Sequence, residues 1–171
     1  MYPLWTGCYG TTEQGGKEKV VEKVLNYLKQ EGVLAPLGGV PTSWQESGEQ
    51  WDLPNTWAPL QHTIVTALQD AGLEEEAFEL ARKWVDNNWI TYRKRKAMFE
   101  KYDSMKQGYP GHGGEYDVQI GFGWSNGVAL EFLSQYGHRL STDLPPVTGG
   151  GGREGGVSLV ILLAVVLVGG W

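Results

Sequence analysis

The sequence predicts an all-α protein, and three observations lead to that prediction. Apolar residues recur every three or four positions in four separate segments, which is the period of an amphipathic helix. No run of any length alternates apolar and polar residues, as a half-buried β-strand would. One segment opens with acidic residues and closes with basic ones, an order that complements the helix dipole. We therefore expect four helices joined by loops.

The first two predicted helices cover residues 17–30 and about 59–72. The apolar stripe of the first consists of Val20, Val21, Val24, Leu25 and Leu28. Gly32 follows it as a stop signal. The second begins near Pro59, a residue suited to the first turn of a helix, and ends at Ala71 and Gly72. Its stripe consists of Leu60, Ile64, Val65 and Leu68.

The third and fourth predicted helices cover about 74–96 and 125–136. The third opens with glutamates at 74–76 and closes with basic residues at 93–96. Its expected buried stripe is Ala77, Leu80, Ala81, Trp84 and Val85. The fourth starts at Ser125 or Asn126 and stops at Gly137. It is expected to bury Val128, Ala129, Phe132, Leu133 and Tyr136.

Two of the connections are long, about 32–58 and about 101–124. Loops of this length inside a compact domain are usually functional or disordered. These two are rich in Trp, Tyr, Gly and Pro and contain few charge runs, which disfavours disorder. In an up-and-down array of helices both loops lie at the same end. We expect them to meet there and to form the functional face.

Composition narrows the possible functions. A chain of 171 residues suffices for one modest domain or a piece of a larger one. A net charge of −6 argues against nucleic acid as a partner. Eight tryptophans fit a carbohydrate site and a large core equally well. Cys8 is the sole cysteine, which excludes an intrachain disulfide. Three scattered histidines and one cysteine lack metal-ligand spacing, so no metal site is expected. No other cofactor is expected.

The C-terminal residues differ from all that precede them. Residues 157–168 are almost wholly apolar, a run shorter than the roughly 20 residues of a membrane-spanning helix. A glycine-rich spacer followed by a hydrophobic tail is typical of a GPI-anchor signal. A marginal membrane anchor and an aberrant tail remain alternatives. The GPI interpretation places the protein on the cell surface and divides the chain into 1–140, a spacer at 141–156 and a tail at 157–171.

Two carboxylates, Glu100 and Glu115, border the second long loop. A pair of acids at an aromatic-rich face suggests glycoside hydrolysis, which uses two carboxyl groups around the scissile bond. Spacing alone is weak support, because carboxylates on helix ends and loops are mostly solvated or cap backbone amides.

Four segments resemble the trehalase family, in the family's order. The sequence "GEQWDLPNTWAPLQ" at 48–61 resembles the signature Q-W-D-x-P-x-x-W-x-P. The sequence "GHGGEYDVQIGFGWSNGV" at 111–128 resembles the G-G-G-G-E-Y segment and the G-F-G-W-T-N-G-V run. "GGVPTS" at 38–43 and "EKYD" at 100–103 also fit. The resemblance covers about residues 2–136 and is greatest to the C-terminal part of animal, GPI-anchored members.

The resemblance implies a fold and an activity. Trehalases are inverting glycosidases that hydrolyse α,α-trehalose to two glucose molecules on an (α/α)6 barrel. Four helices make up about the last third of that ring, so apolar helix faces are expected to lack neighbours. The family's general acid, an aspartate, and its sugar-clamping arginines lie upstream of the signature and have no counterpart here. The chain alone is therefore expected to be inactive. A non-catalytic fragment or membrane-anchored helical module with at most sugar affinity is the alternative, and the oligomeric state is left open.

The resemblance also implies roles for individual residues. Glu100 of the E-K-Y-D motif matches the general base, and Glu115 of the G-G-E-Y motif matches a residue that binds a sugar hydroxyl. Trp51 and Asp52 lie in the signature loop and are expected at the substrate. Trp51 is expected either to stack on a pyranose face or to steady the loop as a core residue. Trp57, Trp84 and Trp124 are expected in the core.

The chain departs from the family pattern at three positions. Ser125 replaces threonine and keeps a hydroxyl for helix capping. Thr56 stands where the family prefers a small apolar residue. His112 replaces a glycine, and it would be strained if that position requires a positive φ.

Overall fold

In the part of the chain that the structure describes, the secondary structure is helical apart from one small sheet. The computed structural model describes residues 2–9 and 15–140. Its helices are α1 (Tyr2–Trp5), α2 (Gly16–Gln30), α3 (Ala58–Asp70), α4 (Glu74–Arg95) and α5 (Gly123–Tyr136). Its strands are β1 (Asn55–Trp57) and β2 (Lys101–Asp103). The predicted helical class is confirmed. The predicted GPI-signal segment, 141–171, lies outside the described residues and stays a prediction.

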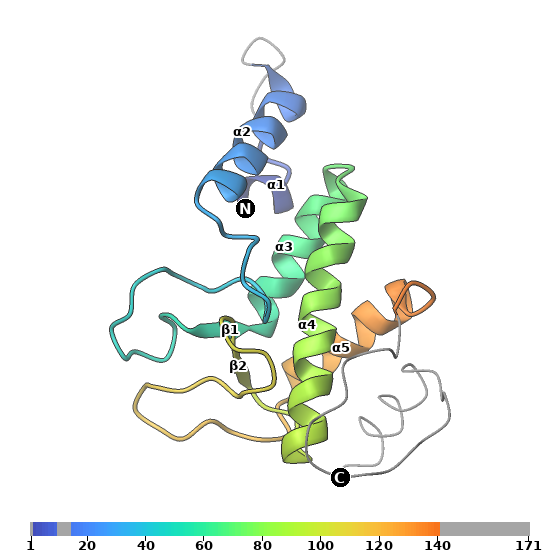
Figure 1. Ribbon diagram of the computed structural model, residues 1–171. Helices are drawn as coiled ribbons and strands as arrows, with labels where there is room; N and C mark the ends of the chain where they lie inside the picture. Colours follow the sequence, from blue (N-terminus) through green and yellow to red (C-terminus); the bar gives the residue numbers. More distant parts are fainter. Residues whose placement is uncertain (1, 10–14, 141–171) are drawn as a thin grey trace.

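The core forms where α3, α4 and α5 pack together. Helices α3 and α4 run side by side and are joined by a tight turn, as predicted (Figure 1). Helix α5 packs against both, and Tyr136 near its end accepts a hydrogen bond from Gln69 of α3 at 2.7 Å. All five members of the predicted stripe on α4 are buried, and so are all five on α5. Trp84 and Leu68 have no exposed surface, so each contributes the full hydrophobic gain of a large core side chain.

Helix α2 has the predicted apolar stripe but few neighbours. Leu28 is its one buried stripe residue in the described part of the chain, whereas Val24 and Leu25 are half-buried. In Figure 1 the helix stands apart from the α3–α4 pair and is joined to it by the first long loop. The apolar face of α2 is thus largely without a covering element among the described residues.

The two strands were not predicted. They pair antiparallel, with Asn55 opposite Asp103, Thr56 opposite Tyr102 and Trp57 opposite Lys101. Three residues are too few to show alternation, and every position of both strands is buried, so no polar face marks them. Helix α1 was also missed, because its four residues are shorter than the window in which helical periodicity appears.

The sheet joins the two long loops, which confirms that they meet at one face. Strand β1 ends the first loop and β2 begins the second. Two isolated bridges, Phe99–Ile120 and Tyr102–Pro110, fold the second loop back on itself. None of the helices in the described ranges combines the length and the apolar character needed to cross a membrane.

Candidate active site

Glu100 lies between the end of α4 and the start of β2, with its main chain held on both sides. Its amide donates to the Gln119 carbonyl at 3.0 Å. Its carbonyl accepts from Trp124 Nε1 and from Ser125 Oγ, both at 3.1 Å. The expected capping role of Ser125 is therefore wrong. Helix α5 begins earlier, with Phe122 as its N-cap, and the hydroxyl serves Glu100 instead.

The Glu100 carboxylate is buried and unpaired. The side chain has no exposed surface, and neither oxygen has a hydrogen-bond partner within the described residues. Burying a charge without partners costs several kcal/mol, so such a group indicates a functional site rather than a solvated helix end. Tyr116 lies close to this charge. The pKa of its phenol is raised, first by desolvation, then by the negative charge of Glu100 and by the closeness of its hydroxyl to that carboxylate, although the two groups do not meet hydrogen-bond geometry.

The other three predicted site residues line one pocket of about 400 Å³. It is bounded by Glu49, Gln50, Trp51, Asp52, Gly114, Glu115 and Tyr116. The signature loop and the glycine-rich loop, residues 111–118, thus both line the pocket. Glu100 does not line this pocket, but Tyr116 does, and Tyr116 also approaches Glu100. A second hollow of about 480 Å³ shares residues 114–116 and follows the glycine-rich loop.

Trp51 has one covered face. Its ring stacks on Trp57 with centroids 4.0 Å apart and planes 11° apart, and it meets Trp124 edge-on at 6.5 Å. Trp57 is buried and Trp124 partly buried, as expected of core tryptophans. Trp51 keeps 40% of its surface exposed. It therefore steadies the loop and also presents aromatic surface to the pocket. The stacking of Trp51 on a sugar stays a prediction.

Asp52 is engaged by its own loop. The Ser43 hydroxyl donates to Oδ1 and the Ser47 hydroxyl to Oδ2, both at 2.6 Å. These two hydrogen bonds, in that order, lower the pKa of Asp52 below its usual value. Both carboxylate oxygens thus close the loop at 43–52. Contact between Asp52 and a substrate remains a prediction.

His112 is not strained. Its φ is not positive, and the left-handed conformation falls instead on Gly113 and Gly114 at 81° and 91°. The imidazole is exposed, and the main chain hydrogen-bonds to Asn55. The expected disturbance at this position is therefore wrong. Thr56 is also accommodated, since its hydroxyl donates to the Val40 carbonyl at 2.8 Å.

Sequence reasoning missed the buried polar side chains that hold the loops. Asn87 on α4 donates to the carbonyls of Gly38 and Asp103, both at 3.0 Å, and accepts from the Gly108 amide at 2.8 Å. Gln61 on α3 bonds both the amide and the carbonyl of Val40. In the sequence, a buried Asn or Gln on a helix cannot be told from one on the surface. Only its position among the apolar residues of the helix indicates that it is buried.

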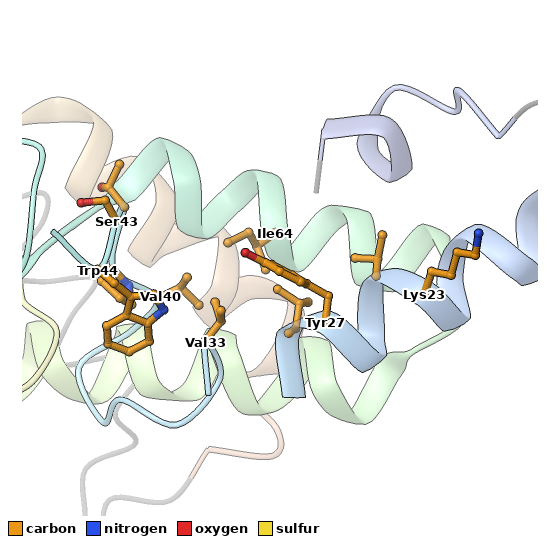
Figure 2. A pocket seen from close by; sticks show the side chains of 11 residues that line it. Lys23, Tyr27, Val33, Val40, Ser43, Trp44 and Ile64 are labelled. Carbon is orange, nitrogen blue, oxygen red and sulfur yellow. The ribbon is translucent and has the colours of Figure 1, made fainter. Parts of the chain in front are cut away.

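A groove of about 490 Å³ lies elsewhere, between α2 and the residues before β1 (Figure 2). Tyr27 of α2 and Trp44 of the loop flank it, and Val33, Val40 and Ile64 contribute aliphatic surface. No carboxylate lines this groove. The carboxylates of Glu49, Asp52 and Glu115 line the pocket between the two loops instead.

Carboxylates and aromatic side chains gathered around one pocket are typical of glycosidase sites. The trehalase family model matches residues 1–137, and the chain belongs to that family.

Curated trehalases of several animals are similar to this chain. The trehalase of Apis mellifera is 42% identical over 99% of the chain and 29% of its own length. The Homo sapiens trehalase is 47% identical and that of Bombyx mori 48%, each over 83% of the chain and 24% of its own length. The chain thus spans between 24% and 29% of the length of these three relatives.

Proposed function

We propose that this chain forms the water-activating side of a site that hydrolyses α,α-trehalose to two glucose molecules with inversion. The observation that carries the proposal is the buried Glu100 carboxylate, which has no hydrogen-bond partner among the described residues. It lies in an E-K-Y-D segment of a chain that belongs to the trehalase family. The proteins similar to it are named trehalases, which supports trehalose as the substrate.

In this proposal Glu100 is the general base. An inverting glycosidase holds a water on the sugar face opposite the leaving group, and a carboxylate takes the proton from that water as it attacks. Glu100 needs free oxygens for this step, and neither is bonded to a described side chain. The hydrogen bonds of the Glu100 main chain to Gln119, Trp124 and Ser125 hold the residue in place and leave its carboxylate available.

Glu115 and Trp51 bind the sugar in the same proposal. Glu115 is exposed on the pocket wall, where its oxygens accept hydrogen bonds from glucose hydroxyls. The uncovered part of the Trp51 ring packs on the pyranose. The general acid comes from a segment outside this chain, so the chain alone does not turn over trehalose. A sugar-binding helical module without catalysis is the second candidate.

The test uses a chimera in which residues 1–137 replace the aligned segment of the Apis mellifera trehalase. Glu100→Gln keeps the shape of the side chain and removes the base, so kcat should fall by about 10²- to 10⁴-fold with little change in KM. Proton NMR of fresh product should show one α- and one β-glucose per trehalose.

The matched control is Glu46→Gln, at an exposed glutamate that lines neither loop pocket. It should leave kcat unchanged. If the Glu100→Gln chimera hydrolysed trehalose as fast as the unsubstituted chimera, Glu100 would not be the base. Two α-glucose products per trehalose would contradict inversion. Turnover by the 171-residue chain alone would overturn the assignment of the acid to another segment.

A further inference from the structure

Two buried polar side chains from the strand pair hold the glycine-rich segment at 111–114. The first is Asn55 of β1, of which 1% is exposed. Its Nδ2 donates to the His112 carbonyl at 2.8 Å, and its Oδ1 accepts from the His112 amide at 2.9 Å. The Asn55 carboxamide thus pairs with one residue of the loop as a neighbouring strand would. The same Nδ2 donates to the Asp52 carbonyl at 3.0 Å, which ties in the signature loop.

The second is Lys101 of β2, also 1% exposed. Its ammonium donates to the carbonyls of Gly113 at 2.9 Å, His112 at 3.2 Å and Gln50 at 3.4 Å. It also lies 5.3 Å from the ring centroid of Trp57, within cation–π range. Backbone carbonyls and an aromatic face thus surround a charge that would be costly to bury alone.

The glycines at 111, 113 and 114 allow this close contact. A Cβ at Gly111 would lie 2.3 Å from Asn55 Oδ1, and one at Gly113 would lie 2.5 Å from the Gly48 carbonyl oxygen. A Cβ at Gly114 would lie 2.5 Å from Gln50 Cβ. The Gly114 amide also donates to the Gly48 carbonyl at 2.9 Å. At these three positions the segment is therefore pressed against the signature loop with no room for a side chain.

We propose that Asn55 and Lys101 are positioning residues, which clamp residues 111–114 and so place Glu115 opposite Trp51. The proposal rests on the sugar-binding role proposed for that pocket. Glu115 directly follows the clamped segment, and both residues line the same pocket.

The clamp acts on sugar binding rather than on the base. The anchors of Glu100 are Gln119, Trp124 and Ser125, none of which belongs to the clamp. Loss of Asn55 or Lys101 should therefore displace Glu115 while Glu100 keeps its place. In kinetic terms KM rises more than kcat falls.

Hydrogen exchange on the 171-residue chain tests the clamp without any sugar. Asn55→Asp keeps the acceptor and removes both donors, and Lys101→Met keeps the stem and removes the ammonium. Each should speed exchange of the His112 and Gly114 amides at least about tenfold, since these amides then open more often. Unchanged exchange at 112–114 in both variants would overturn the proposal.

Asn87→Ala is the matched control, because Asn87 is also fully buried and also bonds two carbonyls and one amide. Its partners lie outside 111–114, so exchange should rise at Gly108 and stay unchanged at His112 and Gly114. A rise at 112–114 as large as that of the clamp variants would mean general loosening and would contradict the clamp.

Kinetics of the Apis mellifera chimera test the effect on the site. Asn55→Asp should raise KM for trehalose about tenfold and change kcat less than about threefold. Lys101→Met should raise KM by a similar factor, and its kcat also reflects the loss of a positive charge close to Glu100. A fall in kcat with KM unchanged would overturn the positioning role. If the unsubstituted chimera does not hydrolyse trehalose, the proposed function fails, and the exchange rates alone decide whether the clamp exists.

Discussion

Asp52 shows how single side chains hold a long loop in one shape. Each of its carboxylate oxygens accepts a short hydrogen bond from a serine of the same loop. Hydrogen bonds to the charged form favour ionisation, which is why the pKa of Asp52 is lowered. The stability that these bonds give the folded state is fully present at pH values above the pKa of Asp52 in the unfolded chain, about 3.9. It is lost as the pH falls through the lower pKa of Asp52 in the folded state.

The removal of one serine hydroxyl tests what lowers the pKa of Asp52. In Ser43→Ala the Asp52 carboxylate loses the hydrogen bond that lowers its pKa most, so its pKa should rise toward the usual value. Carbon-detected NMR of the carboxyl group through an acid titration measures this. Ser134→Ala, at an exposed serine on α5, should leave the titration of Asp52 unchanged. An unchanged pKa in Ser43→Ala would contradict the assigned cause.

At the level of elements, the helices differ in how much of their apolar surface is covered. Helices α4 and α5 bury complete stripes in one core and α3 buries Ile64, Val65 and Leu68 there, whereas α2 buries Leu28 and leaves much of its stripe half-exposed. Helical stability in proteins comes mostly from packing of the amphipathic face. We therefore expect α2 to contribute little to the free energy of unfolding.

Two leucines of the same size test this difference. Leu68→Ala on α3 removes a side chain with no exposed surface and should lower the free energy of unfolding by about 2–5 kcal/mol. Leu25→Ala on α2 removes a half-buried one and should cost about 1 kcal/mol or less. Urea denaturation followed by tryptophan fluorescence measures both. Equal costs would show that α2 is packed as tightly as α3.

At the scale of the whole molecule, the described residues leave an apolar groove open to solvent. Tyr27 and Trp44, which flank the groove in Figure 2, are 60% and 46% exposed. Exposed apolar patches rimmed by polar groups are typical of surfaces that associate. The predicted exposure of apolar helix faces is consistent with this groove and with the half-exposed stripe of α2.

Self-association of the 171-residue chain is the expected consequence. The average mass in sedimentation velocity should rise with concentration, because association removes the groove from water. The double variant Tyr27→Ser and Trp44→Ser should associate less. Ile120→Ser changes a residue that is 68% exposed but outside the groove, and it should have no effect. A single monomeric species at every concentration would contradict the prediction.

The sequence by itself determined helices α2 to α5 and the family of the chain. Apolar periodicity predicted α2 to α5, because packing of one face imposes a repeat that survives in the sequence. The motifs around Glu100 and Glu115 indicated the trehalase family, to which the chain belongs. The assigned roles of these two residues stay predictions.

Only the tertiary structure decided how the loops hold that site. The strands β1 and β2 have no pattern in the sequence, since they are short and buried on all sides. The contacts of Asn55 and Lys101 join residues far apart in the chain, and no local periodicity encodes such contacts. That the Glu100 carboxylate has no hydrogen-bond partner among the described residues is likewise a property of packing, because the surrounding loops define what its oxygens meet.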